Sequence, residues 1–520
     1  MKVTGVAKNA FIVAVLTALS RVLGLGREML QSRLIGAGVA QSAFALAFAL
    51  PNMARKLFGE GALTAAFVPV FKNELENSSL EAAAKLARSV MTMVMMILAS
   101  FVVLSILGLD AFAAWRGWLE TADSERFSLT LDLVKILLPY MIFICAAAFG
   151  MGVLNSFGRF KAAGFMPSLL NICWIGALAG IWFFPGFEVA FRIKIVAWAV
   201  LFAGALQMVF MFWMMAKKGV FPYPSFALWR DPKFRLVWRN VAIGALGAGA
   251  IQLNYLLDQF LAQLAAPWAA GVIGYAERLM DLPLGIVGVS FGTVLLPTLS
   301  GHFAKGDLDG ARKALIDSLS PLLFVMVPAA AGLMVLAPEV TGFIYEGGEF
   351  DSVATVRVSR ALAVYSAGLA FFGFQKVFVP WFQAQGDMKT PLRVSVCTVV
   401  LNAIFNILAV WLLPVEWRHV GLAVSTVVCS GVGCLLLGIR ARMKNGDLGL
   451  AAILPRLGRI IVASLLMACV ICIVKKVLPI ESYFWRTAIL VPLGGGVYLA
   501  LTFLTCTFFR RKLMPLAGVL

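Results

Sequence analysis

Charged residues interrupt several segments of the chain that are otherwise long and apolar enough to cross a lipid bilayer. The stretch SRVLGLGRE (20–28) places Arg21, Arg27 and Glu28 inside an apolar run that begins at Ala10. Ionised side chains within a bilayer are costly, so their default interpretation is functional, with a partner nearby. Arginine presents a planar fork of N–H donors that fits phosphate oxygens, and it keeps its proton. These residue types therefore indicate binding of an anion, such as one with several phosphates, inside the membrane.

Similar charges lie in two more apolar segments, which are interrupted by Pro51 and Pro283. Broken helices at membrane depth occur where they line a cavity or are covered by protein. We predict that one cavity gathers a substrate-binding cationic set, formed by Arg21, Arg27, Arg55 and Arg278. We predict that acids orient these arginines and keep them apart, namely Glu28, Glu60, Glu277 and Asp281.

The alternative for this charged set is structural. Arg21–Glu28 and Arg278–Asp281 could be ion pairs that only hold helices together. Arg55 could instead reach the cytoplasmic interface, as long basic side chains near helix ends do. The structural alternative explains poorly why arginine exceeds acid in segments from opposite halves of the chain.

A second polar cluster lies in the C-terminal half of the chain. A sodium site is predicted at Asp258, Asn402, Asn406 and Thr426, with Ser425 as the alternative to Thr426. Carboxylate, amide and hydroxyl oxygens are suitable ligands for a hard cation. Hydrogen bonding between helices is the commoner role for such residues, and it stays open here.

The composition sets the class of protein. Of 520 residues, 61% are hydrophobic and 13% are charged, which is typical of an integral membrane protein. The formal charge of +18 is explained by basic cytoplasmic loops, so no nucleic-acid partner is expected. All eight cysteines fall in apolar segments, which favours neither a disulfide framework nor a zinc site. Phosphate-loop motifs are missing, so energy would come from ion gradients, the membrane potential or the gradient of the substrate itself.

Hydropathy predicts an all-α integral membrane fold with about 14 transmembrane helices, and the basic loops place both termini in the cytoplasm. An internal repeat relates residues 153–172 to 381–400, with Gly158 matching Gly386. The repeat predicts two six-helix lobes related by pseudo-two-fold symmetry, plus two extra C-terminal helices. The predicted divisions are an N-terminal lobe, a basic cytoplasmic linker, a C-terminal lobe and the extra helices, at 1–216, 217–237, 238–440 and 441–520.

Three segments carry a resemblance to a known family: SRVLGLGRE (20–28), AFALAFALPNMARKLFGEGALTAAFVPVF (43–71) and YAERLMDLPLGIVGVSFGTVLLPTLS (275–300). The chain resembles the MurJ (MviN) lipid II flippases of the MOP transporter superfamily over nearly its whole length. The resemblance implies that the four arginines are essential, that Glu28 and Glu60 are their acidic neighbours, and that the last two helices form a lipid-tail groove. In some members a sodium site occupies the C-terminal lobe. One departure is Ser42, which stands where the family commonly has an aspartate.

The resemblance also implies a function. The expected activity is flipping of lipid II, the undecaprenyl-pyrophosphate-linked disaccharide-pentapeptide of peptidoglycan biosynthesis, across the bacterial cytoplasmic membrane by alternating access. This is transport without enzymatic chemistry, with lipid II, membrane lipids and the peptidoglycan synthesis machinery as partners. The alternatives are a MOP-type exporter of another polyprenyl-linked glycan or of drugs, a membrane enzyme acting on polyprenyl phosphate, and an envelope scaffold. A cationic cavity argues against drug exporters, which favour cationic substrates.

Overall fold

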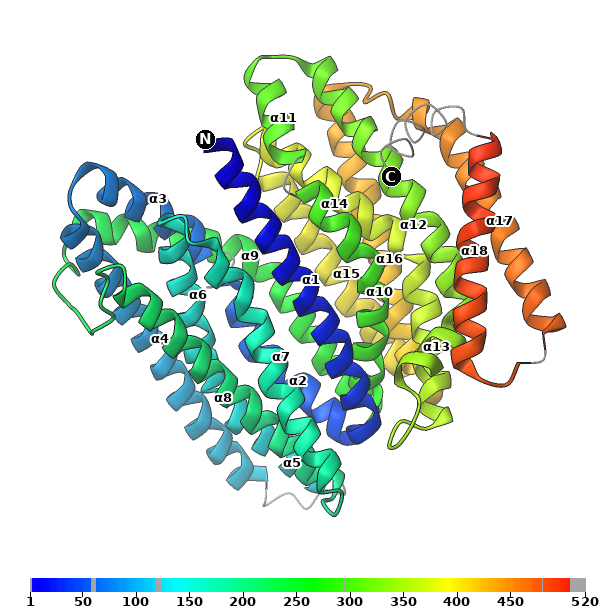
Figure 1. The fold of residues 1–520 in the computed structure, drawn as a ribbon, viewed down its shortest axis with the longest axis horizontal. Coiled ribbons are helices and arrows are strands. Elements are labelled where there is room, and N and C mark those ends of the chain that lie inside the picture. Colours follow the sequence, from blue (N-terminus) through cyan, green and yellow to red (C-terminus); the bar gives the residue numbers. More distant parts are fainter. Residues whose placement is uncertain (1, 58–61, 117–123, 293–294, 479, 506–520) are drawn as a thin grey trace. The chain divides into compact units, whose positions relative to one another are not determined.

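The fold is built from α-helices, as the apolar runs predict. The computed structural model describes residues 2–57, 62–116, 124–292, 295–478 and 480–505, and in these ranges it contains no strand (Figure 1). A single isolated β-bridge joins Gly347 and Phe350. In a bilayer the helix is favoured because it satisfies every backbone N–H and C=O group within one segment.

The chain divides into two compact units by packing. The first holds residues 1–263 together with 347–350, and the second holds the remainder. The helices of the first unit are α1 (Lys2–Ile35), α2 (Val39–Ala54), α3 (Ala62–Asn77), α4 (Leu80–Arg116), α5 (Ser124–Leu137), α6 (Tyr140–Ser156), α7 (Phe160–Phe183), α8 (Val189–Ala216) and most of α9 (Pro232–Ala265).

The second unit continues the helical pattern to the end of the described chain. Its helices are α10 (Ala269–Gly292), α11 (Leu295–Ala304), α12 (Leu308–Tyr345), α13 (Ser352–Ala367), α14 (Leu369–Ala384), α15 (Lys389–Leu412), α16 (Val415–Asn445), the short 3₁₀ helix η2 (Leu450–Ile453), α17 (Leu454–Val477) and α18 (Tyr483–Thr505).

The two units pack their helices in matching pairs. In the first unit α2 packs on α5, α3 on α4 and α6, and α8 on α6 and α7. In the second unit α10 packs on α13, α11 on α12 and α14, and α16 on α14 and α15. Adding eight to the number of a helix in the first unit gives its counterpart in the second unit. The pair α2 and α5, for example, corresponds to α10 and α13. The two remaining helices, α17 and α18, both pack on α12 (Figure 1).

The internal repeat found in the sequence has the same backbone geometry in each unit. Gly158 ends the turn after α6 with φ +71°, and Gly386 ends the turn after α14 with φ +72°. Each glycine N–H donates to the carbonyl three residues earlier, at 2.9 Å in both turns. Left-handed backbone geometry favours glycine, so the repeated glycine marks the same helix termination in both copies.

Nine helices of the described residues are long and apolar enough to cross a membrane, or ten if the bent pair α13–α14 is one span. That pair bends by 45°. The apolar segment that contains Pro51 is divided into α2 and α3 of 16 residues each, too short for this criterion. The chain is therefore multi-pass and all-helical, and the count of about 14 spans stays a prediction.

The boundary between the packing units comes near the end of α9, after Gln263, and not at the basic linker. The side chain of Gln263 in α9 donates to the carbonyl of Ser42, and its own Oε1 accepts from Arg126 Nη2 at 2.8 Å. Near the start of the same helix, Lys233 Nζ lies 2.6 Å from Glu74 Oε1. These contacts group most of α9 with the first unit, whereas the predicted C-terminal lobe begins at residue 238. The predicted lobe organisation stays a prediction.

Candidate functional site

Two of the predicted arginines line one cavity within the first unit. The cavity has a volume of about 530 Å³ and is lined by residues of α1, α2, α6, α7 and α8, and by Arg55 just after α2. Its polar lining consists of Arg27, Asn52, Arg55, Tyr140, Asn171 and Gln207. Aliphatic and aromatic side chains such as Phe48 and Leu170 form the remaining wall. A cavity with two guanidinium groups and neutral amides is suited to an anion.

Arg27 is held in this cavity by contacts from two helices. Its Nη1 donates to Asn171 Oδ1 of α7 at 3.0 Å, and its Nη2 donates to the carboxylate of Glu28. The guanidinium carbon lies 4.3 Å from the ring centroid of Trp174, a cation–π contact. The Arg27 side chain is only 16% exposed, and its Nε is buried without a hydrogen-bond partner in the described part of the chain. Arg27 is therefore oriented in the cavity wall by Glu28, Asn171 and Trp174.

A π-helical turn that directly follows α2 positions Arg55. Helix α2 contains Pro51 and ends at Ala54, and residues 55–57 continue as a π-helical turn. Proline removes a backbone donor, and π-helical turns are common at functional sites. Nε and Nη2 of Arg55 donate to Asn52 Oδ1 at 3.2 and 3.1 Å. The neutral amide orients Arg55 without cancelling its charge.

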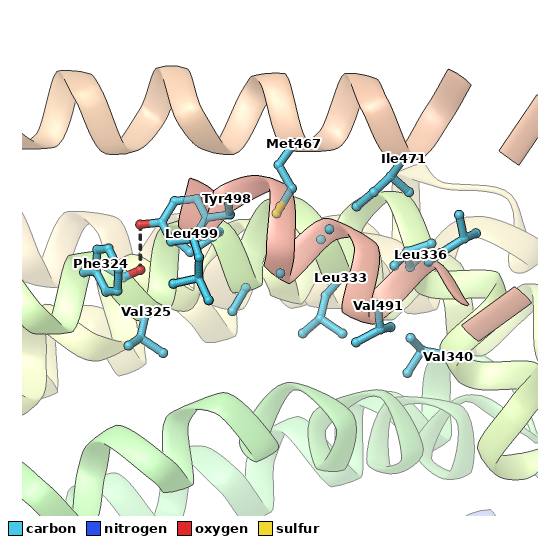
Figure 2. Close-up of a pocket in the computed structure, with 16 residues that line it drawn as sticks. Phe324, Val325, Leu333, Leu336, Val340, Met467, Ile471, Val491, Tyr498 and Leu499 are labelled. Atoms are coloured by element: carbon cyan, nitrogen blue, oxygen red, sulfur yellow. Dashed lines mark hydrogen bonds between the residues drawn. The ribbon is translucent and has the colours of Figure 1, made fainter. Parts of the chain in front are cut away.

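A second candidate feature is an apolar groove within the second unit. It has a volume of about 350 Å³ and lies between α12, α17 and α18 (Figure 2). Figure 2 shows Phe324 and Tyr498 at one end, joined by a hydrogen bond from the Tyr498 hydroxyl to the Phe324 carbonyl. Ile471 and Leu336 lie toward the other end. The lining is almost entirely hydrocarbon, so the groove is suited to an apolar chain.

Comparison with known proteins identifies the family to which the chain belongs. A family model described as "Lipid II flippase MurJ" matches residues 31–490. The chain belongs to the MurJ family.

Similar relatives extend the match over most of the chain. A probable lipid II flippase MurJ of Rickettsia prowazekii is 30% identical over 468 residues, covering 90% of each chain. Lipid II flippase MurJ of Burkholderia cenocepacia is 32% identical and covers 82% of each chain.

Solved structures agree with this MurJ assignment. A structure of lipid II flippase MurJ in an inward closed conformation aligns with a TM-score of 0.78 and 25% identity, over 96% of this chain and 99% of that one. An inward-facing multidrug resistance MATE transporter of the MOP superfamily has a TM-score of 0.68 at 16% identity, over 85% and 99% of the two chains. The second likeness shows the fold alone.

The other predicted arginines and acids of the MurJ motifs lie in several places. Arg21 is exposed and is not among the cavity's lining residues. Glu60 lies outside the described residues. Arg278 belongs to α10 in the second unit, where its guanidinium carbon lies 5.9 Å from the Tyr275 ring. On the same helix Glu277 is half-buried and Asp281 is exposed. Convergence of Arg278 with the arginines of the first unit stays a prediction.

The predicted sodium ligands fall in both units. Asn402 Nδ2 donates to Thr426 Oγ1 at 3.4 Å, and Asn406 Nδ2 donates to Asn402 Oδ1 at 2.7 Å. Ser425 donates to the Asn402 carbonyl at 3.2 Å. Asp258 is in the first unit and accepts from Asn254 Nδ2 at 3.1 Å. Because the Asn402 and Thr426 side-chain oxygens already accept bonds from amides, this arrangement has the form of helix–helix hydrogen bonding.

Sequence reasoning missed the residues that hold Arg27. Asn171 and Trp174 lie in an apolar segment 144 and 147 positions after it, and both face Arg27 through the packing of α1 on α7. Gln207 was also missed; it is buried, and its Nε2 donates to the Met166 carbonyl at 2.7 Å. An isolated amide inside an apolar segment was the available signal for Asn171 and Gln207.

Proposed function

We propose that this protein is a lipid II flippase, moving the undecaprenyl-pyrophosphate-linked disaccharide-pentapeptide from the inner to the outer leaflet of the bacterial cytoplasmic membrane. The MurJ family match over residues 31–490 carries the proposal. It is supported by one cavity that contains two arginines and by a separate apolar groove. A substrate with an anionic head and a hydrocarbon tail needs both kinds of surface.

The chemistry of the head-group site follows from its arginines. Arg27 and Arg55 would bind the pyrophosphate oxygens, because guanidinium donors match their geometry and stay charged. Glu28 would hold Arg27 in place between substrates. In the proposal Arg21 and Arg278 join these two when the lobes close on the head group, with Glu60, Glu277 and Asp281 as orienting acids.

The proposed architecture is 14 spans in two six-helix lobes, at 1–216 and 238–440, joined by the basic linker 217–237. The matching helix pairs of the two units support this symmetry. Alternating access would then be rocking of one lobe against the other. The region 441–520 would supply α17 and α18 as walls of a groove for the polyprenyl tail, which the apolar lining of the groove supports.

The energy source and surroundings complete the proposal. Export of an anion is favoured by a potential that is negative inside, by about 2.3 kcal/mol per charge per 100 mV. Sodium binding by Asp258, Asn402, Asn406 and Thr426 would be a further source, tested by the sodium dependence of transport. The termini are proposed to be cytoplasmic, and the peptidoglycan synthesis machinery is a proposed partner. No enzymatic step is proposed.

Complementation tests this function directly. A bacterium depleted of its own flippase is supplied with this chain or with Arg27→Ala or Arg55→Ala. We expect the wild-type chain to restore growth and either variant to fail at equal protein levels. Arg159→Ala is the matched control, because Arg159 is exposed and lies outside the cavity in the same unit. Full rescue by both cavity variants would contradict the head-group assignment, and failure of the wild type would contradict the proposed function.

A further inference from the structure

One end of the apolar groove contains a cluster of ionised side chains around a buried carboxylate. Glu339 of α12 is only 1% exposed. Its Oε1 lies 2.6 Å from Lys475 Nζ of α17 and 3.9 Å from Arg486 Nη1 of α18. The hydroxyl of Thr487, also in α18, donates to the Glu339 carbonyl at 3.0 Å. One residue of α12 is therefore bound to both of the helices that form the other walls of the groove.

The cluster directly continues the groove lining. Ile471 lines the groove four residues before Lys475, and Leu490 lines it four residues after Arg486. Residues four apart share a helix face, so both cations lie one turn beyond the apolar lining. A separate cavity of only about 10 Å³, which Lys475 and Arg486 help to line, shares Leu490 with the groove. That volume is about the minimum for one water molecule, so a hydrocarbon chain does not fit between these two cations and Leu490.

Different kinds of contact join α12 to its neighbouring helices at the two ends of the groove. At the opposite end the link between α18 and α12 is a neutral hydrogen bond from Tyr498 to the Phe324 carbonyl, at 2.9 Å. Breaking a buried ion pair leaves an uncompensated charge and is far more disruptive than losing a neutral bond. The groove's shape is therefore most sensitive to Glu339, some 15 residues or about 22 Å along α12 from Phe324.

We propose that Glu339 is a positioning residue for the hydrocarbon tail: by holding α17 and α18 against α12, it fixes the width and the closed end of the groove. This inference rests on the proposed function, which supplies a substrate with a polyprenyl chain. The polyprenyl tail gains affinity by burying its methylene groups in the groove. A wider groove buries them less fully, which lowers the contribution of the tail to the binding free energy. Arg27 and Arg55 are in the other packing unit, so their contacts with the head group do not depend on Glu339.

The test compares two ligands that share a head group and differ in the tail. Binding of undecaprenyl diphosphate and farnesyl diphosphate is measured in lipid nanodiscs, and the ratio of their affinities isolates the tail. We expect Glu339→Ala to lower this ratio about tenfold, the loss expected when about two methylene groups lose their burial. Glu339→Gln keeps the side-chain shape and a neutral hydrogen bond, so its loss is smaller.

The control is an ion pair of the same unit away from the groove. Arg357 and Glu416 are paired at 3.0 Å with the carboxylate exposed, so Glu416→Gln removes an ion pair between helices without touching the groove and should leave the ratio unchanged. A general loss of folding would lower the affinity for both ligands, whereas loss of the groove lowers only the advantage of the long tail. An unchanged ratio in folded Glu339→Ala would overturn the proposal.

A second variant keeps the test decisive if Glu339→Ala does not fold. Lys475→Met removes the other partner and should lower the same ratio, while Lys476→Met changes an exposed neighbour and should not. If the wild-type protein binds neither diphosphate, the proposed function is contradicted. A long tail that raises affinity by the same factor in the wild type, in Glu339→Gln and in Lys475→Met is the other negative result. That result would contradict only the role of Glu339.

Discussion

Replacing Asn171 by alanine should release Arg27 from its position in the cavity. The amide makes two contacts that bridge α7 to α1: Oδ1 accepts from Arg27 Nη1 at 3.0 Å, and Nδ2 donates to the Ser20 carbonyl at 3.0 Å. Within the described residues, Arg27 already has one buried donor without a partner, its Nε. The substitution would therefore leave a second guanidinium donor unsatisfied.

The size of the effect follows from these two bonds. A hydrogen bond to a charged group contributes about 1.5–3 kcal/mol, and a neutral one about 0.5–1.5 kcal/mol. Arg27 keeps Glu28 and Trp174, and water in the cavity can partly replace the amide. We therefore expect Asn171→Ala to lower the free energy of unfolding by about 2 kcal/mol, near the low end of the sum. Affinity for a diphosphate should fall about tenfold because one of its donors is no longer oriented.

Both quantities are measurable on the purified protein in lipid nanodiscs. Unfolding by a denaturing detergent gives the stability, and titration with undecaprenyl diphosphate gives the affinity. Asn77→Ala is the control, because Asn77 is an exposed amide of the same unit. If Asn171→Ala binds as the wild type does while Arg27→Ala has lost binding, then Glu28 and Trp174 suffice to orient Arg27, and the reasoning from the amide is refuted.

Two further predictions concern packing and pH. A Cβ at Gly204 would lie 2.4 Å from Tyr140 Cδ2, so Gly204→Ala should lower the free energy of unfolding by about 1–3 kcal/mol through overpacking. A Cβ at Gly180 would lie in open space, so Gly180→Ala is the control. Equal stability of the two variants would refute overpacking at Gly204. Hydrogen bonding from Lys444 helps to lower the pKa of Asp387 to about 2. The pKa is depressed below the unfolded value of about 3.9, so this contribution is present above pH ~4 and is lost as the pH falls toward ~2. Asp387→Asn should make the free energy of unfolding in detergent less dependent on pH between ~4 and ~2. A pH profile equal to that of the wild type would contradict the pairing of Asp387 with Lys444.

Those parts of the site that depend on local sequence were predictable. Intramembrane arginine is costly, and this alone marked Arg27 and Arg55, which share a cavity. Pro51 does not interrupt the helix where it stands: α2 continues through it to Ala54, and the change to a π-helical turn comes at Arg55. The repeated glycines, Gly158 and Gly386, have the same backbone geometry because a left-handed turn restricts the choice of residue.

Contacts between distant segments could not be predicted from spacing. Arg21 and Glu28 are seven residues apart on one helix, a spacing that offers an ion pair as the structural alternative; the contact between Glu28 and its neighbour Arg27 did not follow from that spacing. Asn171 and Trp174 reach Arg27 only because α7 packs on α1. A single asparagine in an apolar segment fits a helix–helix contact equally well, so one sequence cannot choose between the two roles.

The separation of the arginine cavity from the apolar groove has a physical reason. Guanidinium groups bind phosphate most strongly where the surroundings exclude bulk water. Burying them there is costly unless their N–H groups are hydrogen-bonded, as Arg27 is to Asn171 and Arg55 is to Asn52. Those amides would weaken a surface meant for hydrocarbon, because each would need a hydrogen-bond partner that a polyprenyl chain lacks. A lipid with a charged head and a long tail is thus recognised best by two surfaces on different helices. In the groove, the ions at Glu339 remain compatible with an apolar lining because they stand at its end, where Lys475 pairs with Glu339 Oε1 at 2.6 Å.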